Sequence, residues 1–377
     1  MITLDGYRVA KPDDLPTPAM IVYRDLVSHN IRSVCEVANG GQNLFTHVKT
    51  HKSLAITRMQ IAMGIDQFKC ATLTELEMIL QAGARRAILA YPLTQKCKIE
   101  RLLELAAIYP DPWIATIASS PIHLEMLGDV AARRGQRQPV MLDLDDGMHR
   151  TGIRMDRDAV KLYQEIDRHP FLEAAGLHLY DGHDSFCDVN QRAEAALRHI
   201  GALRDFRRLI ESAGMPVPFI VAGGAYSFAY YARAEGMYGS PGSFIYWDQR
   251  CRSDMPDMPF RNAALILAQV VDRHPGQGTF TTDLGYKNIC SDQPIEARVR
   301  LLGHETASLF MHNEEFGVFR VAGDVPAIGT FLLAVPGHIG PTTVRYPGGY
   351  VIDSEGAVVD YYEHTARDRA IQRPDVR

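Results

Sequence analysis

The sequence predicts an α/β protein in which a (β/α)₈ TIM-type barrel is followed by a second, mainly β C-terminal domain. Two observations support this fold class. Up to about residue 260, short apolar runs alternate with longer segments of helical periodicity, a pattern typical of parallel strands connected by helices. Beyond that point the helical segments stop, and short strand-like runs separated by Gly and Pro turns follow. This second pattern is typical of an all-β domain.

The predicted barrel strands are short apolar runs that recur along the first part of the chain. They are residues 44–48, 67–71, 87–90, 114–118, 140–144, 174–180, 219–222 and 243–247. The amphipathic segments between them are predicted helices, at residues 54–63, 73–82, 98–107, 124–134, 158–168 and 191–212. Eight strands, most of them followed by a helix, favour a closed barrel over an open doubly wound sheet.

The predicted strands of the second domain are shorter and lie between turns. They are residues 264–271, 279–282, 297–302, 318–321, 331–335 and 350–352. Their spacing by Gly and Pro turns favours an all-β domain.

The composition is that of an ordinary globular protein, with 46% apolar and 23% charged residues. Lys and Arg number 40 against 45 Asp and Glu, a net charge of −5, so no excess positive charge is available for nucleic acid or an anionic membrane. The longest nearly apolar run, residues 263–271, is interrupted by Gln269 and is far shorter than the roughly 20 residues of a membrane-spanning helix. The acidic and proline-rich N-terminus does not resemble a leader. We expect a cytoplasmic protein, with no nucleic-acid or membrane partner.

The first candidate for chemistry lies at the end of the first predicted strand. In a (β/α)₈ barrel the active site is built at the carboxyl ends of the strands. The first strand runs into HVKTHK, which places Lys49 between His47 and His51. A lysine amine whose surroundings make it reactive can form a Schiff base with a carbonyl group. A solvated loop lysine is the competing interpretation from composition alone.

Two further strand ends carry polar side chains. The fifth predicted strand continues into DDGMHRTG, which places Arg150 on a loop, and the sixth ends in HLYDGH, which presents Tyr180, Asp181 and His183 together. Clustering at strand ends favours a functional role. Taken singly, Tyr180 also fits a half-buried core tyrosine, and His183 also fits a loop histidine.

Glycine-rich segments border the seventh and eighth predicted strands. VAGGAYS and SPGSF contain Gly223, Gly224, Gly242 and Ser243, where backbone amides can approach an anion closely. The loops after strands seven and eight are the recurrent phosphate site of this barrel. A reactive lysine together with a phosphate site suggests pyridoxal 5'-phosphate (PLP).

These motifs together identify a resemblance. The chain resembles the D-threonine aldolase and D-serine dehydratase family, PLP enzymes of the alanine-racemase-like fold. The resemblance covers nearly the whole chain and rests on DLPTPAMIVYRDLVSHNI, HVKTHK, ATLTELEMILQAGARRAILAYP, DDGMHRTG, GLHLYDGH, the glycine loops, DLGYKN, NEEFG and PGHIGPT.

The resemblance implies a division of the chain and a set of site residues. The PLP-binding barrel is expected at residues 24–260, and the β-domain at residues 1–23 plus 261–377. Lys49 is the expected Schiff-base lysine, and a homodimer is expected in which each active site takes groups from the neighbouring β-domain. Together with the strand-end residues above, the predicted cofactor-binding set is Lys49, His47, Arg150, Tyr180, Gly223, Gly224, Gly242 and Ser243.

The chain departs from the family pattern in three motifs. Phe45-Thr46-His47 stands where relatives have Arg-Pro-His, Phe316 stands where they have a histidine, and Gly340 stands where they have a metal-binding Cys or Asp two residues after His338. His338 alone would bind a first-row metal weakly. We therefore expect the divalent metal of the family to be absent or weakly bound, with His338 as its one candidate ligand.

The expected reaction follows from the resemblance and from this departure. Without a metal to assist loss of hydroxide, retro-aldol cleavage of a D-β-hydroxy-amino acid to glycine and an aldehyde or keto acid is favoured, with His183 or His338 as the base. The alternatives are racemase or transaminase chemistry at the α-proton, and dehydration of D-serine or hydroxyaspartate. A non-catalytic PLP carrier is a further alternative, from a different class.

Overall fold

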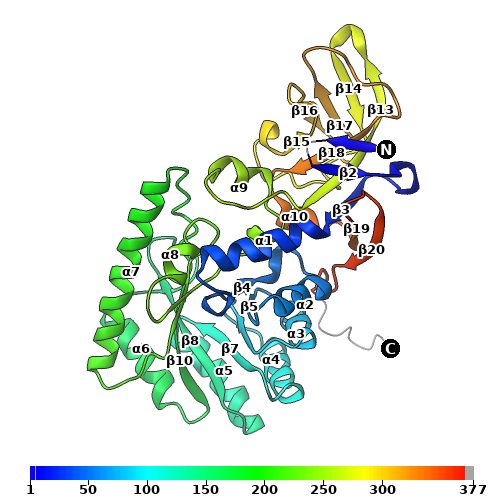
Figure 1. The fold of residues 1–377 in the computed structure, drawn as a ribbon. Helices are drawn as coiled ribbons and strands as arrows, with labels where there is room; N and C mark the ends of the chain where they lie inside the picture. The colour runs from blue at the N-terminus through cyan, green and yellow to red at the C-terminus, as the bar shows by residue number, and fades with distance from the viewer. Residues whose placement is uncertain (5, 370–377) are drawn as a thin grey trace. The chain divides into compact units, whose positions relative to one another are not determined.

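The computed structural model describes residues 1–4 and 6–369, and it contains two compact units (Figure 1). The barrel unit comprises Val34–Lys49, Thr57–Gly242 and residues 368 and 369. The β-unit comprises Met1–Ser33, Thr50–Ile56 and Ser243–Arg367, apart from residue 5. The domain boundaries expected from the resemblance stay a prediction.

A parallel sheet of eight strands forms the barrel. In spatial order its strands are β4 (Thr46–His47), β5 (Gln67–Cys70), β6 (Arg86–Leu89), β7 (Trp113–Ala118), β8 (Gln138–Asp145), β10 (Leu172–Leu179), β11 (Ile220–Ala222) and β12 (Met237–Gly239), with the short β9 (Ile153–Arg154) beside β8. The first and last strands meet, because the amide of Phe45 donates to the carbonyl of Gly239 at 2.9 Å and that of His47 to Pro241 at 2.8 Å. The predicted (β/α)₈ barrel is therefore confirmed.

Helices follow most of these strands, and all but the short α8 agree with the predicted amphipathic segments. They are α2 (Leu54–Ala62), α3 (Leu73–Ala82), α4 (Lys96–Ile108), α5 (Pro121–Arg134), α6 (Arg157–Arg168), α7 (Val189–Ser212) and α8 (Phe228–Ala232). Local sequence explains where they begin and end: the Thr72 side chain caps α3, and Gly83 ends it in the left-handed conformation. Asp188 caps α7 by accepting from the amides of Asn190 and Gln191.

The eighth barrel strand was placed wrongly. Residues 243–247 begin with a 3₁₀ turn, η4 (Ser243–Ile245), and Trp247 has φ +50°, which does not fit an extended strand. The strand is Met237–Gly239, a three-residue segment with little apolar signal. Residues 244–247 are buried, and a short buried apolar run does not distinguish a strand from a turn.

The barrel interior is filled by apolar side chains. One core cluster consists of Phe45, Ile88, Ala115, Ile117, Met141, Ala175 and Val221, all nearly inaccessible to solvent. As in other barrels of this type, the centre is a packed core rather than a pore. The residues available for binding and chemistry are those at the strand ends.

The β-unit contains a mostly antiparallel sheet. Its strands are β3 (Ala19–Tyr23), β13 (Ala264–His274), β14 (Thr279–Thr282), β15 (Val299–Leu301), β16 (Ser308–His312), β17 (Gly317–Arg320), β18 (Phe331–Pro336), β19 (Gly348–Ile352) and β20 (Val358–Glu363). The predicted all-β character is confirmed, although β16, β20 and the N-terminal pair β1 (Ile2–Leu4) and β2 (Tyr7–Val9) were not predicted. β3 lies between β13 and β19, so a strand from the N-terminus belongs to this sheet.

The remaining helices of the β-unit are α1 (Arg24–Val37), which continues into the barrel unit, and the short α9 (Gln249–Asp254) and α10 (Ile339–Thr343). Within the described part of the chain, no helix has both the length and the apolar character needed to cross a membrane.

Candidate active site

Three cationic side chains from separate segments of the barrel unit lie close to one tyrosine ring. Lys49 follows β4, Lys69 lies within β5, and Arg150 lies on the loop after β8. The Nζ atoms of Lys49 and Lys69 lie 5.7 and 5.9 Å from the centroid of the Tyr180 ring, and the Arg150 guanidinium carbon lies 4.6 Å from it. These distances are within reach of cation–π attraction. The fold thus brings together three of the predicted site residues, Lys49, Arg150 and Tyr180, and adds Lys69.

Two glycines make room for the Tyr180 ring. A Cβ atom at Gly182 would lie 2.4 Å from the ring, and a Cβ atom at Gly224 would lie 2.9 Å from it. Neither separation is possible without movement of the ring, so glycine is required at both positions for Tyr180 to keep its place. Gly224 was predicted as part of a phosphate site, and in this structure it also supports Tyr180.

The amides of the predicted glycine cradle already have acceptors. The Gly223 amide donates to the carbonyl of Leu179 at 3.1 Å, and the Gly224 amide donates to the hydroxyl of Ser227 at 3.2 Å. Gly242 is the last residue of its segment of the barrel unit, and Ser243 is the first residue of η4 in the β-unit. The phosphate role of Gly223, Gly224, Gly242 and Ser243 stays a prediction.

Lys69 was missed in the sequence analysis, and its surroundings are unusual. Its side chain is buried, and burial together with the positive charge of Lys49 lowers the pKa of Lys69 to about 7, although Asp143 and Asp181 oppose the shift. Near neutral pH the amine therefore gives up its proton easily, and an anion beside it would restore the charge. A lysine inside the apolar strand run QFKC was the available signal.

A buried pair lies on the two strands next to this group. His178 on β10 and Asp143 on β8 are register partners, and a hydrogen bond of 2.7 Å joins Nδ1 of the histidine to Oδ1 of the aspartate. Burial lowers the pKa of His178, while the bond to Asp143 opposes the shift. The other polar atoms of the pair, His178 Nε2 and Asp143 Oδ2, have no hydrogen-bond partner among the described residues. Buried polar atoms are normally hydrogen-bonded, so these two atoms indicate that a polar ligand binds beside them.

His47 positions the backbone that carries the lysine. Its Nδ1 accepts a hydrogen bond from the amide of Lys49 at 3.3 Å, and its ring is buried. The predicted contact of His47 with a cofactor is untested, but this bond shows that it orients the turn at Lys49.

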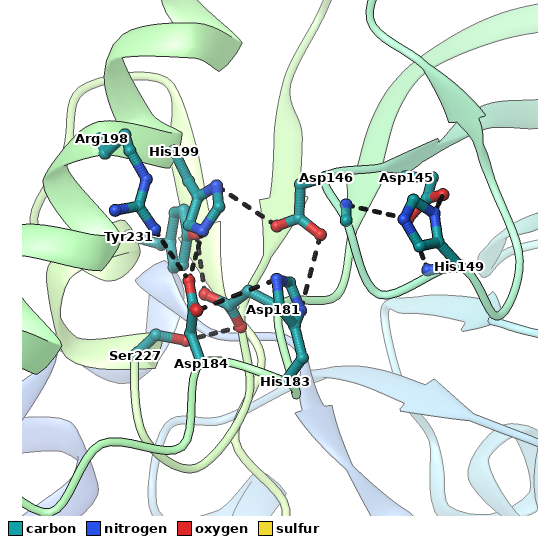
Figure 2. A network of polar contacts seen from close by, with 11 residues as sticks. Asp145, Asp146, His149, Asp181, His183, Asp184, Arg198, His199, Ser227 and Tyr231 are labelled. Carbon is teal, nitrogen blue, oxygen red and sulfur yellow. Dashed lines mark hydrogen bonds and ion pairs between the residues drawn. The ribbon is translucent and has the colours of Figure 1, made fainter.

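His183, the predicted base, lies in a second polar group together with Asp146 and His199 (Figure 2). The separation between His199 Nδ1 and an Asp146 oxygen is 3.3 Å, and that between His183 Nδ1 and the other Asp146 oxygen is 3.9 Å. Asp184 lies on the far side of both rings, 2.6 Å from His199 Nε2 and 3.8 Å from His183 Nε2. His199, Asp146 and Asp184 were not predicted.

Asp181 fixes the turn that carries His183. It is buried and accepts hydrogen bonds from the hydroxyls of Ser227 and Tyr231, each at 2.9 Å. Burial raises the pKa of Asp181 although both hydroxyl bonds oppose the shift. Its role in the structure is to tie the turn after β10 to the segment after β11.

His338 lies in the β-unit beside two potential ligands that the sequence analysis did not consider. His338 Nδ1 is 2.5 Å from Asp292, and the thiol of Cys290 donates to the other oxygen of Asp292 at 3.0 Å. The ligand atoms of these three residues lie within 4.8 Å of one another. The premise that His338 has no ligating neighbour is therefore wrong, although Gly340 itself offers nothing.

The family of the chain follows from comparison with known proteins. Residues 22–250 match the family described as "Alanine racemase, N-terminal domain", which is more than half of the chain. The chain belongs to this family. Residues 263–352 match a second model, described as "Putative serine dehydratase domain". A barrel followed by a β-domain agrees with both matches.

Among relatives of this alanine racemase N-terminal domain protein, a D-threonine aldolase from Arthrobacter sp. is 25% identical, with 95% of each chain covered. D-threo-3-hydroxyaspartate dehydratase from Delftia sp. strain HT23 is 22% identical, with 91% of this chain and 96% of the other covered. The crystal structure of D-threonine aldolase from Filomicrobium marinum superposes with a TM-score of 0.85 at 23% identity, covering 94% of this chain and 96% of that one. The resemblance seen in the motifs is confirmed.

The residues around Tyr180 fit the cofactor of this family, PLP. The cofactor carries a phosphate and a phenolic oxygen, both of which bear negative charge, and Lys49, Lys69 and Arg150 supply positive charge beside the Tyr180 ring. The orphaned polar atoms of His178 and Asp143 offer further contacts. The β-unit group Cys290, Asp292 and His338 likewise offers a donor set suited to a divalent metal.

Proposed function

We propose that the chain is a PLP-dependent lyase that acts on D-amino acids, and that it cleaves a D-β-hydroxy-amino acid to glycine and an aldehyde or keto acid. The observation that carries the proposal is the convergence of Lys49, Lys69 and Arg150 on Tyr180 at the carboxyl ends of the barrel strands. A group of positive side chains that contains a lysine at a strand end and a buried lysine, Lys69, suits an anionic cofactor with an aldehyde.

Each residue of this group would have a distinct role in binding the cofactor. When bound, PLP supplies an electron sink that stabilises negative charge at the α-carbon of an attached amino acid. Lys49 supplies the amine that holds the cofactor, and His47 fixes the turn on which that amine is carried. Lys69 and Arg150 balance negative charge, and Tyr180 provides a flat apolar face held by Gly182 and Gly224.

Retro-aldol cleavage needs a base that takes the proton of the β-hydroxyl group. His183 and His338 are the candidates, and each lies beside a carboxylate that can orient its ring: Asp146 for His183 and Asp292 for His338. The likeness to two D-threonine aldolases over nearly the whole chain supports cleavage as the reaction.

Dehydration is the second candidate, and one observation favours it. Cys290, Asp292 and His338 would hold a divalent cation, and a Lewis acid assists departure of the β-hydroxyl group. The dehydratase from Delftia sp. among the relatives acts on a β-hydroxy-amino acid by its name. The loss of a ligand at Gly340 is thus no longer sufficient reason to prefer a metal-independent reaction.

The proposal includes the homodimer and the cytoplasmic, small-molecule setting that the sequence analysis expects. Light scattering on the purified protein tests the dimer, since a monomer at micromolar concentration would contradict it.

Product analysis distinguishes the candidate reactions. The purified protein is saturated with PLP and incubated separately with D-threonine, D-phenylserine, D-serine and D-alanine, and aldehydes, keto acids and the configuration of remaining amino acids are measured. The expected result is aldehyde plus glycine from D-threonine or D-phenylserine, with Lys161→Ala as an active control because Lys161 is an exposed surface residue. Keto acid without aldehyde would show a dehydratase, L-alanine a racemase, and bound PLP without any turnover a carrier.

A further inference from the structure

We propose that Asp146, His183 and His199 form a binding site for a divalent transition-metal ion, such as Zn²⁺, in the barrel unit. The three side chains come from separate segments: the end of β8, the turn after β10, and α7. Their ligand atoms lie within 4.8 Å of one another, and in Figure 2 the two imidazole rings and the Asp146 carboxylate point toward a common region. None of its three residues belongs to the set proposed to hold PLP or to the Cys290, Asp292 and His338 group.

The spacing suits first-row metal coordination. Ligands at about 2.0–2.2 Å from a tetrahedral zinc ion lie about 3.4 Å from one another. His199 Nδ1 is 3.3 Å from one Asp146 oxygen, and His183 Nδ1 is 3.9 Å from the other. A small inward movement of the His183 ring, whose side chain is 32% exposed and hence has room to turn, completes the set.

The Asp146 carboxylate is the strongest sign that something is to be bound. Its side chain is only 2% exposed, yet neither oxygen has a hydrogen-bond donor among the described residues. A buried carboxylate without donors is costly, and burial raises the pKa of Asp146 accordingly, with Asp181 adding to the shift while His199 and His183 oppose it. A dication between the carboxylate and the two rings would supply the missing interaction for both oxygens.

Asp184 selects the form of His199 that a metal requires. His199 Nε2 lies 2.6 Å from an Asp184 oxygen, so this nitrogen carries the proton and donates a hydrogen bond to the carboxylate. The lone pair is then left on Nδ1, which is the atom nearest Asp146. Arg198 holds the same carboxylate at 3.3 Å. A carboxylate that orients a metal-binding histidine from its far nitrogen is a recurrent feature of such sites.

The donor set also indicates the class of ion. Two imidazoles and one carboxylate suit Zn²⁺, Co²⁺, Fe²⁺ or Ni²⁺, whereas Mg²⁺ and Ca²⁺ prefer oxygen ligands. Three protein ligands leave at least one position for water or a ligand. The competing interpretation is an ion-pair network in which a doubly protonated His199 links Asp146 to Asp184 with no metal. A metal ligand would also leave His183 without the free nitrogen that a base needs, so His338 would take that role.

Cobalt substitution tests the site with a readout that does not depend on turnover. Full-length protein is stripped with chelator, loaded with Co²⁺ and studied by visible absorption and elemental analysis. Cys290→Ser is the background, because it weakens the second cluster and removes any thiolate band. The expected result in this background is one tightly bound Co²⁺ per chain whose absorption disappears in Cys290→Ser/His199→Ala.

Matched variants keep the experiment decisive. His149→Gln, in the same background, is the control: His149 is an exposed histidine four residues from Asp145 and contacts that carboxylate rather than Asp146. It should retain the ion. Asp184→Asn should weaken Co²⁺ binding by about 10- to 100-fold, as expected for an outer carboxylate. If His199→Ala does not fold by circular dichroism, Asp146→Asn, which keeps the side-chain shape, replaces it. A Cys290→Ser protein that binds no Co²⁺, or equal Co²⁺ binding in the His199→Ala and parent proteins, would overturn the proposal.

Discussion

The barrel unit carries two polar groups of opposite sign at the carboxyl ends of its strands. Around Tyr180 the charged groups are cations: Lys49, Lys69 and Arg150. Around His199 and His183 they are two carboxylates, Asp146 and Asp184, of which Asp184 also pairs with Arg198. The loop after β8 contributes to both, because Asp146 and Arg150 lie four positions apart along it. The strand ends of one parallel sheet therefore carry both a group of positive side chains, suited to an anion, and a group of carboxylates and histidines, suited to a cation.

The third group, in the β-unit, consists of Cys290, Asp292 and His338. Asp292 accepts from the Cys290 thiol and contacts His338, and these hydrogen bonds lower its pKa although burial opposes the shift. Asp146 has no such donors among the residues that the structure describes. The group at Asp292 is therefore satisfied without a ligand, whereas the group at Asp146 is not. A metal has to displace hydrogen bonds in the first case and supplies missing interactions in the second.

Lys49→Ala should have the largest effect and would test the cationic group. Loss of the amine removes the covalent attachment of PLP, so the Schiff-base absorbance should vanish and turnover should fall by on the order of 10³-fold or more. Spectra and product formation are measured beside Lys161→Ala, which removes an exposed lysine of the same charge. Lys49 is not among the residues proposed to bind the metal, so Co²⁺ binding by the Lys49→Ala protein should be unchanged. An unaltered PLP spectrum would show that another lysine holds the cofactor.

Lys69→Met should weaken binding of an anionic cofactor analogue by about tenfold or more at pH 6, since a buried positive charge beside the anion is lost. The pKa of Lys69 in the free protein is lowered to about 7, and a bound anion raises it. Below pH 7 the amine is already charged and binding takes up no proton; above pH 7 a proton has to be taken up, so affinity falls.

The affinity difference between parent and Lys69→Met protein should therefore be largest at pH 6 and shrink as the pH rises above 7. Calorimetric titration with 4'-deoxypyridoxine 5'-phosphate, which has no aldehyde, measures it without Schiff-base chemistry. A difference that is the same from pH 6 to pH 9 would contradict a role of the Lys69 charge.

Gly224→Ala tests whether the cationic group depends on the position of Tyr180. The new Cβ would lie 2.9 Å from the ring, so the ring has to move, at a cost of about 1–3 kcal/mol in stability. Affinity for PLP should fall as well, because the face against which the three cations are arranged is displaced. Denaturant unfolding and PLP titration check both effects. Unchanged affinity together with reduced stability would assign Gly224 to the fold alone.

The fold and the meeting of several strand-end residues around Tyr180 were largely predictable from the sequence. Strands, helices and the strand-end residues Lys49, Arg150 and Tyr180 each leave a local signal, namely an apolar run, a helical period or a motif directly after a strand. Lys69 was harder to predict as a site residue, because a lysine inside an apolar strand is usually expected to reach solvent. Only the folded barrel shows that its side chain is buried.

The histidine and carboxylate groups could not be predicted, for a physical reason. His199 lies on the fourth turn of a long helix, where a histidine also fits an ordinary surface, and its partner Asp146 is more than fifty residues away. Cys290 and Asp292 are two residues apart in a loop, and His338 follows β18 much later in the chain. Tertiary packing alone makes these residues neighbours. The eighth strand was missed because Met237–Gly239 is held by pairing with its neighbour β11, not by its own apolar pattern.

Gly201→Ala should have the smallest effect and would separate the stability of α7 from its role in metal binding. Gly201 lies within α7, two residues after His199, and a Cβ atom there meets nothing within 4 Å. Alanine in a helix interior is favoured over glycine by roughly 0.5–1 kcal/mol, so the free energy of unfolding should rise by up to about that amount. The substitution acts mainly by making the unfolded chain less flexible. In the folded protein the His183 and His199 rings should therefore keep their positions beside Asp146, and Co²⁺ affinity should stay the same. A large change in Co²⁺ affinity would mean that His199 reaches the metal only when α7 distorts. The metal site of Asp146, His183 and His199 would then not be preformed.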